Sequence, residues 1–167
     1  DEFIEEIDKL MDMTDPDLVY LLFDSGHLTF AGIDPVPVLK KYINRVKHVH
    51  LKDVRMDVYN NQVVPNHMSF LDAVRAGVFT VPGDGSIDFT GVFKALPNYS
   101  GWVVLEAEQD SKKANPKKYV NMGITNLKRF LAEAASPPHF RDVVRAFSVT
   151  PENRKGLRDI LKSLEVE

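Results

Sequence analysis

His48-Val49-His50-Leu51-Lys52-Asp53 is the stretch on which the interpretation of the whole sequence depends. A β-strand sends residues i and i+2 to the same face. If residues 46–51 form a strand, His48 and His50 share one face of it, and Val49 and Leu51 share the other. Two imidazoles at the carboxyl end of a strand suit a metal ion or a polar substrate. The alternative is a pair of core histidines that hydrogen-bond to the backbone or to solvent.

The sequence on either side of this stretch alternates between helical patterns and strand-like apolar runs. Helices are predicted near 3–11, 34–42, 69–75, 88–96 and 116–133, and strands at 18–23, 46–51, 78–81 and 102–105. The run 18–23 is continuously apolar, which is typical of a strand that is buried on both faces. Residues 55–68 are polar and are predicted to form a long irregular loop.

This alternation predicts an α/β fold with a parallel sheet and helical crossovers. The strands start at intervals typical of a (β/α)8 TIM barrel, of which four β/α units make one half. An open doubly wound sheet is the alternative. We divide the chain into a half barrel at 1–135 and a helical tail of unknown role at 136–167, with tail helices predicted near 140–147 and 151–164.

The composition excludes several classes of protein. The 167 residues are 44% hydrophobic, which is enough for one core and short for two. A formal net charge of -3, without basic runs, argues against nucleic acid and anionic membranes as partners. The absence of cysteine excludes disulfides and thiol chemistry. The sequence contains no signal peptide or apolar run of membrane-spanning length, so we expect a cytoplasmic protein. Because Asp1 leads directly into a helical pattern, we expect a piece of a longer protein.

Metal-ligating residue types follow the predicted strands. In a barrel the carboxyl ends of the strands converge on one face, where active sites lie. The residues at these ends are Asp24 and His27; His48, His50, Lys52, Asp53 and Arg55; Asp84; and Glu106 and Glu108. Aspartate, histidine and glutamate from separate strands form an oxygen and nitrogen donor set. Such a set suits Mn²⁺, Co²⁺, Mg²⁺, Fe²⁺ or Zn²⁺.

Each of these residues also has a structural interpretation. Asp24 could cap the following turn, and Lys52 could be a solvated charge or an electrophile beside a carbonyl. Asp53 and Arg55 could pair with each other. The Gly83-Asp84-Gly85 segment lacks the rest of a phosphate-binding motif, and we interpret it as a tight turn. Glu106 and Glu108 could be solvated, although the apolar run before Glu106 favours partial burial and a cationic partner.

Four longer segments resemble the xylose isomerase-like TIM-barrel superfamily, which includes sugar isomerases, ketose epimerases and endonuclease IV. They are residues 23–32, 48–55, 70–85 and 101–110. Aspartate, histidine and glutamate at strand ends are shared across the superfamily. The longer strings more specifically resemble the inosose dehydratase family of myo-inositol catabolism. The resemblance runs from about residue 1 to 134, so that the chain corresponds to roughly the last four β/α units of the barrel.

The resemblance implies a divalent metal, most often Mn²⁺ or Co²⁺, held by two glutamates, one aspartate and one histidine. Asp24, His50 and Glu106 match three of these positions, and the fourth falls in the half barrel that this chain lacks. The substrate implied is a small polyol ketone, scyllo-inosose, which loses water to give a trihydroxycyclohexane-1,2-dione. Glu106 is mainly a metal ligand in this comparison and also a candidate base, and His27, His48 and Lys52 are candidates for the acid, with the individual assignment left open. For substrate binding, His27 matches a position near the substrate in the related epimerases, Arg55 matches a substrate-contacting arginine with a different spacing, and Glu108 is a further candidate.

Three functional hypotheses follow. The chain belongs to a metal-dependent hydro-lyase, or to a sugar isomerase or epimerase with the same metal site, or it is a half barrel without catalytic activity. A half barrel would leave two sheet edges and an apolar sheet face uncovered. We therefore expect the chain to associate with itself or with the missing N-terminal half barrel.

Overall fold

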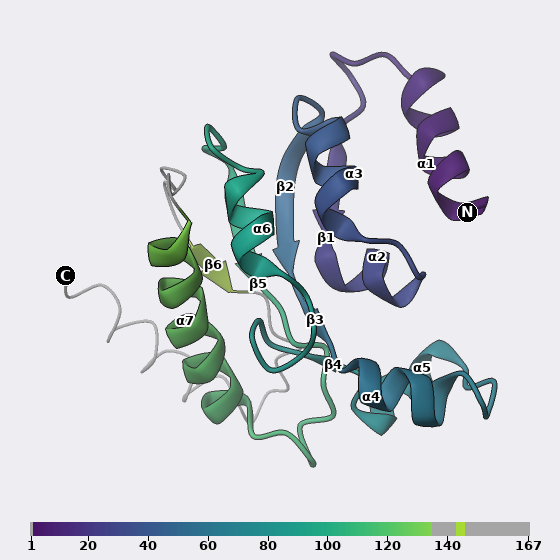
Figure 1. The fold of residues 1–167 in the computed structure, drawn as a ribbon, viewed down its shortest axis with the longest axis vertical. Coiled ribbons are helices and arrows are strands. Elements are labelled where there is room, and N and C mark those ends of the chain that lie inside the picture. The colour runs from purple at the N-terminus through teal and green to yellow at the C-terminus, as the bar shows by residue number, and fades with distance from the viewer. Residues whose placement is uncertain (1, 135–142, 146–167) are drawn as a thin grey trace.

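The computed structural model describes residues 2–134 and 143–145, which form an α/β fold around a parallel sheet (Figure 1). The elements in chain order are α1 (Glu2–Asp12), β1 (Leu21–Asp24), α2 (Ser25–Phe30), α3 (Pro35–Tyr42), β2 (Val46–Leu51), β3 (Asp53–Val54), α4 (Met56–Val58), the π-helical turn η1 (Tyr59–Val63), α5 (Phe70–Ala76), β4 (Phe79–Thr80), α6 (Phe89–Lys94), β5 (Trp102–Leu105), α7 (Pro116–Glu133) and β6 (Val143–Arg145).

The main sheet has the strand order β1-β2-β5-β6, and all of its pairs are parallel. His48 of β2 lies between Leu22 of β1 and Trp102 of β5, and His50 lies opposite Asp24. The carboxyl ends of β1, β2 and β5 therefore meet at one edge of the sheet. The predicted parallel sheet with helical crossovers is confirmed in the described residues.

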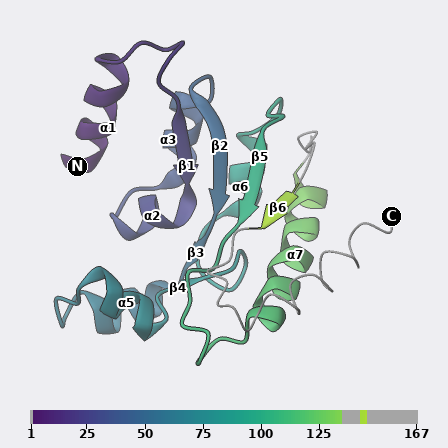
Figure 2. The same cartoon turned by 180° about the vertical axis from the view of Figure 1, so that it is seen from behind.

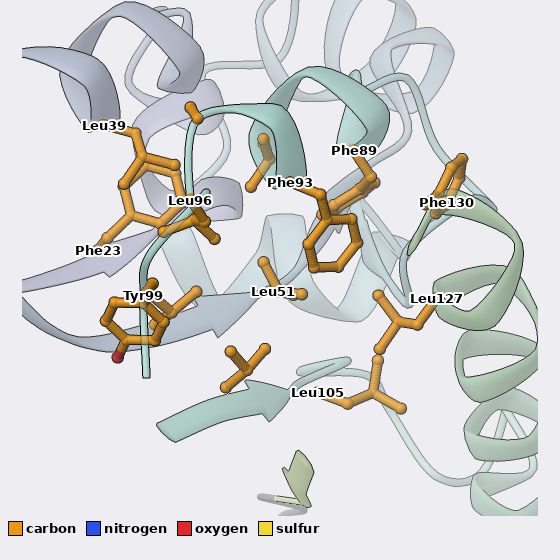
Figure 3. Packing of buried hydrophobic residues seen from close by; sticks show 14 of the residues in the cluster. Phe23, Leu39, Leu51, Phe89, Phe93, Leu96, Tyr99, Leu105, Leu127 and Phe130 are labelled. Atoms are coloured by element: carbon orange, nitrogen blue, oxygen red, sulfur yellow. The ribbon is translucent and has the colours of Figure 1, made fainter. Parts of the chain in front are cut away.

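Helices α3, α6 and α7 cover one face of this sheet. Phe23, Val49, Leu51 and Leu105 point from the strands toward these helices and are almost fully buried. Figure 3 shows Phe23, Leu51 and Leu105 packed with the helical members of the cluster, which include Leu39, Phe89, Phe93, Leu96, Leu127 and Phe130. Burial of each such side chain contributes about 1.5–3 kcal/mol, so this layer holds the strand ends in place.

The opposite face of the sheet, which we call the open face, carries no described helix (Figure 2). Its residues alternate with those of the core along each strand. Leu22 and Trp102 on this face are each 48% exposed, and His48 lies between them. The prediction that the first strand is buried on both faces is therefore wrong, because the described residues supply a core on one side only.

Four other predictions need correction. The first strand begins at Leu21, because the backbone N–H groups of Leu18 and Val19 bond to Asp15 in a turn. The run 78–81 does not enter the main sheet: β4 pairs antiparallel with β3. Residues 56–63 are helical in α4 and η1 rather than irregular. Residues 143–145, predicted as part of a short helix, form β6 beside β5, as suits consecutive valines. The helix predicted at 151–164 lies outside the described residues.

Side-chain caps begin four of the remaining helices. Asp34, Ser69, Asp88 and Asn115 each accept a backbone N–H bond at the start of α3, α5, α6 and α7, and side chains of this type satisfy donors that a helix leaves unpaired. Within the described residues, none of the helices combines the length and the apolar character that a membrane span requires.

Tyr99 gives the core a measurable pH dependence. Its side chain is buried, its hydroxyl donates to the Trp102 carbonyl oxygen at 2.9 Å, and burial raises the pKa of Tyr99 to about 12. The unfolded chain releases this proton near pH 10. The contribution of Tyr99 to stability is therefore complete below pH 10 and is lost as the pH rises through 12, by up to about 2.7 kcal/mol.

We expect ultraviolet titration at 295 nm to show an ionisation near pH 12 that Tyr99→Phe removes. Replacing the exposed Tyr20 by phenylalanine is the control and leaves this step in place. Ionisation of Tyr99 near pH 10 in the folded chain would contradict the assignment.

Candidate metal centre

Asp24, His50 and Glu106 come together at the carboxyl ends of β1, β2 and β5. The His50 Nδ1 atom lies 3.0 Å from Glu106 Oε2 and 3.7 Å from Asp24 Oδ2. One potential ligand atom from each residue lies within 4.8 Å of the other two. Donor atoms around one ion that binds each of them at about 2.0–2.2 Å must be this close. The structure thus brings together the three metal ligands that the resemblance implies.

Asp24 has the capping role that its sequence context suggested, and its second carboxylate oxygen faces the candidate metal centre. Its Oδ1 atom accepts the His27 backbone N–H at 2.9 Å and caps α2. Its Oδ2 atom faces the other way, toward His50 and Lys52. The cap fixes the carboxylate plane, so the same contact that starts the helix orients the second oxygen into the site.

Lys52 is the unexpected member of this group, because its side chain is only 1% exposed. Its ammonium lies 2.5 Å from Glu108 Oε2 and 2.8 Å from His27 Nε2. It also lies 3.3 Å from Glu106 Oε2 and 3.4 Å from Asp24 Oδ2. Burial alone would lower the pKa of Lys52, but the nearby Asp24, Glu108 and Glu106 outweigh burial and raise it, so the lysine is charged.

Gly26 in α2 makes room for this lysine. A Cβ atom at Gly26 would lie 2.7 Å from Cγ of Lys52, closer than real Cβ contacts come. The methylene stem of Lys52 therefore passes directly against the backbone of α2. The motif Asp24-Ser25-Gly26-His27 thus supplies a ligand and the space for the buried cation, while Ser25 accepts the Lys52 backbone N–H at 3.1 Å.

Formal charges in the cluster fit a divalent cation. Asp24, Glu106 and Glu108 carry three negative charges, and the Lys52 ammonium neutralises one of them. A net charge of -2 remains on carboxylates that are partly buried. Carboxylates in such a position need a cation. Two carboxylates and an imidazole are ligands that Mn²⁺, Co²⁺ and Zn²⁺ accept. The residues present therefore fit the metal that the family implies.

Glu108 is held near Lys52 by an unusual backbone conformation. Its φ angle is +42°, in the left-handed region that costs a residue with a Cβ atom about 1–2 kcal/mol. The turn directs the Glu108 carboxylate to the Lys52 ammonium. Strain of this kind persists where the surrounding structure enforces it, and it occurs often at functional sites.

His27 and His48 lie at different borders of the site. The side chain of His27 is 48% exposed and stacks on Phe70, with 5.7 Å between ring centroids. His48 lies on the open face, 5.1 Å from the ring of His50. Burial and the neighbouring His50 lower the pKa of His48, so His48 is neutral at pH 7. Its position on the same face as His50 is as predicted.

Arg55 and Asp53 belong to two other clusters rather than to a shared ion pair. Arg55 donates to the Gly77 carbonyl at 2.6 Å and pairs with Asp84 at 2.5 Å. Asp53 is fully buried and accepts four backbone N–H bonds, from Val54, Gly83, Gly85 and Ile87. Burial raises the pKa of Asp53, although these four bonds lower it in part. The 83–85 segment is thus the predicted tight turn, and contact between Arg55 and substrate stays a prediction.

Comparison with known proteins agrees with this geometry. The model of the xylose isomerase-like TIM barrel family matches residues 2–130. Inosose dehydratase of Clostridium tetani (strain Massachusetts / E88) is 64% identical over 117 residues, which are 69% of this chain and 39% of that protein. Inosose dehydratase of Clostridium botulinum (strain Alaska E43 / Type E3) is 55% identical over 134 residues, 79% of this chain and 43% of that protein. The resemblance that the sequence motifs suggested is confirmed.

The chain spans about two fifths of the length of the curated relatives it matches. Inosose dehydratase of Geobacillus thermodenitrificans (strain NG80-2) is 62% identical over 117 residues, which are 69% of this chain and 39% of that protein. The family model covers more than three quarters of the present sequence, and the parallel strands with ligand residues at their carboxyl ends agree with it. The chain belongs to the xylose isomerase-like TIM barrel family.

Proposed function

We propose that this chain forms the metal-binding part of a hydro-lyase that dehydrates scyllo-inosose to a trihydroxycyclohexane-1,2-dione in myo-inositol catabolism. The observation that carries the proposal is the Asp24, His50 and Glu106 donor set, at the carboxyl ends of three strands. The 55–64% identity to proteins named inosose dehydratase supports the choice of reaction.

The three ligands would hold a divalent ion, for which we propose Mn²⁺ or Co²⁺. Such an ion supplies Lewis-acid stabilisation of the negative charge that develops on the ketone oxygen when the neighbouring C–H bond breaks. Loss of the β-hydroxyl group follows. The proton lost from carbon and the departing hydroxide together make up the water that is eliminated. This chain must therefore orient the ketone, accept one proton and assist the departing hydroxyl.

His27 is the side chain best placed to assist the departing hydroxyl. Its ring is half exposed, held against Phe70 and fixed by the Lys52 ammonium at Nε2. Proton transfer requires a group within hydrogen-bond reach of the substrate. Lys52 is nearly inaccessible, which favours a positioning role for it. His48 seldom carries a proton to give at neutral pH, because burial and the neighbouring His50 lower its pKa. We assign proton removal from carbon to the carboxylate of Glu106, and substrate hydroxyl binding to Glu108 and Arg55.

The open face supports the proposal that this chain needs a partner for the reaction. Leu22 and Trp102 are half exposed, and His48 lies partly buried between them in a row across three strands. A barrel of this family encloses such a row. We propose that the remaining part of the longer relatives covers the open face and adds the fourth ligand. A second copy of this chain is the other occupant that we consider.

The test is turnover of scyllo-inosose, followed by the ultraviolet absorbance of the dione. We expect turnover when the chain is co-expressed with the part of the C. tetani protein that it does not match, and when Mn²⁺ or Co²⁺ is present. A chelator should abolish turnover. Turnover that continues in the presence of a chelator would contradict the proposal. The absence of turnover when both the metal and the added segment are present would also contradict it. An isomeric ketose as the product would assign epimerase chemistry instead.

A further inference from the structure

The two ring nitrogens of His27 have different surroundings. The Nε2 atom lies 2.8 Å from the Lys52 ammonium nitrogen, 3.5 Å from Glu108 Oε2 and 3.8 Å from Asp24 Oδ2. In the part of the chain that the structure describes, every hydrogen-bonding and ion-pair contact of the ring is made by Nε2. The Nδ1 atom of this half-exposed side chain is therefore left for a group outside the described residues.

Lys52 determines which of these nitrogens can carry the ring proton. An ammonium group has three N–H donors and no acceptor. At 2.8 Å the Nε2 atom must present its lone pair to Lys52, because an Nε2–H bond would turn a second donor toward the ammonium. The carboxylates that could accept an Nε2–H bond, those of Glu108 and Asp24, lie farther from Nε2. In a neutral imidazole one nitrogen donates and the other accepts, so the proton is on Nδ1.

The ammonium is held in place by contacts that do not involve the histidine. Glu108 Oε2 lies 2.5 Å from Nζ, and oxygens of Glu106 and Asp24 lie at 3.3 and 3.4 Å. Together these carboxylates raise the pKa of Lys52 against the effect of burial. Gly26 leaves room for the lysine stem. Lys52 therefore keeps both its charge and its position beside Nε2.

The plane of the His27 ring is fixed as well. Phe70 stacks on His27 with an angle of 17° between the rings, and the ring of Phe79 lies 5.6 Å away. A flipped imidazole would place a carbon atom instead of Nε2 against the Lys52 ammonium. The stack and the lysine contact together define one orientation of the ring, and the partners of a ring define its tautomer.

We propose that Lys52 is a positioning residue that fixes the proton of the neutral His27 ring on Nδ1, and that this Nδ1–H bond donates to an oxygen of the bound substrate. The inference rests on the proposed function and deepens it, because it names the atom that contacts the substrate. An Nδ1–H donor selects an oxygen with a free lone pair, such as a hydroxyl or ketone oxygen of a polyol ketone. A donor that is already in place needs no rearrangement when the substrate arrives.

Nitrogen-15 NMR of the full chain without metal locates the ring proton, because protonated and unprotonated ring nitrogens resonate far apart. At about pH 8, above the ordinary histidine pKa of about 6.5, we expect the Nδ1–H form of His27. Lys52→Met should lose this form, because the carboxylates of Glu108 and Asp24 then accept an Nε2–H bond. Lys47→Met removes an exposed lysine of the same strand. It is the matched control and should keep the Nδ1–H form.

An Nε2–H or doubly protonated His27 ring in the unaltered chain would overturn the inference. A folded Lys52→Met variant that keeps the Nδ1–H form would also overturn it. If Lys52→Met does not fold, as judged by circular dichroism, the scalar coupling between Lys52 Nζ and His27 Nε2 across their hydrogen bond is measured in the unaltered chain. An Nδ1–H ring without this coupling would show that Lys52 does not fix the proton.

The two proposals fail in different ways. The NMR measurements need neither metal nor substrate, so their outcome does not depend on the turnover that tests the proposed function. An Nδ1–H ring that depends on Lys52, together with no turnover in the presence of metal and the added segment, would leave the tautomer in place and contradict the dehydratase activity. Turnover together with an Nε2–H ring would contradict only the role of Lys52.

Discussion

Asp24→Ala is expected to lower the affinity of the chain for Mn²⁺ at least about a hundredfold. Asp24 is one of three ligands, and changes to groups that only support ligands already cost 10–100-fold in affinity. The variant also loses the N-cap of α2, which costs about 1 kcal/mol of stability. Titration calorimetry measures the first effect, and thermal unfolding measures the second.

Two further variants separate the ligand from the cap. Asp24→Asn keeps a side chain that caps helices as well as aspartate does but removes a charge that would bind the metal and that also faces the buried Lys52 ammonium at 3.4 Å. We therefore expect weak Mn²⁺ binding with the N-cap of α2 retained. Asp34→Ala removes the equivalent cap of α3, where Asp34 accepts the Val36 N–H at 3.0 Å, and should leave Mn²⁺ binding unchanged. Unaltered affinity in Asp24→Asn would show that Asp24 is only a cap.

Asp53→Ala is expected to destabilise the fold by about 3–5 kcal/mol. The carboxylate is fully buried and receives the N–H groups of Val54, Gly83, Gly85 and Ile87 at 2.8–3.0 Å. Alanine leaves these four donors without their acceptor; the bond from the Val54 N–H is buried and the other three are partly buried. A buried donor without a partner costs about 1–3 kcal/mol. A loss of this size is a large share of the 5–15 kcal/mol typical of a folded domain.

Urea denaturation followed by circular dichroism measures this loss. Asp53→Asn retains one acceptor oxygen and introduces an amide that donates, so its stability should lie between that of the alanine variant and that of the unaltered chain. Asp57→Ala is the control, because Asp57 is exposed and should change stability by no more than about 0.5 kcal/mol. A free energy of unfolding for Asp53→Ala within about 1 kcal/mol of the unaltered value would contradict the role of Asp53.

Local signals in the sequence were sufficient to predict where helices α3 and α7 begin. Asn115 followed by Pro116 predicts the start of α7, and Asp34 followed by Pro35 predicts that of α3. Caps and prolines act on the nearest residues, so their effect can be read without knowledge of the fold. Helix α2 was missed although Asp24 was recognised as a possible cap. Six residues that include a glycine carry too little periodicity to indicate a helix.

Strand partners could not be read from the sequence. Phe79 and Thr80 have the composition of any buried strand, and only the fold determines that they pair with Asp53 and Val54 outside the main sheet. Similarly, the apolar character of Leu22 predicts burial, but its exposure depends on which segments lie across the open face.

The sequence was sufficient to predict the metal-ligating residues of the candidate site but not the buried Lys52 beside them. Asp24, His50 and Glu106 stand at the ends of strands that the sequence indicates. A lysine after a strand is ordinarily solvated, so the burial of Lys52 becomes visible only when Gly26 and Glu108 are placed beside it. The positive φ of Glu108 likewise has no signal in sequence, because residues other than glycine seldom adopt it.

The position of Trp102 on the open face has an optical consequence. It is the single tryptophan of the chain, it is about half exposed, and it lies at the start of β5 opposite His48 of β2. Tryptophan emission shifts to shorter wavelength when water leaves the indole. The emission wavelength of the chain therefore reports whether the open face is exposed to solvent. The protein thus carries an intrinsic, label-free probe of whether another segment or chain covers the open face, which can be read during purification without any knowledge of the substrate.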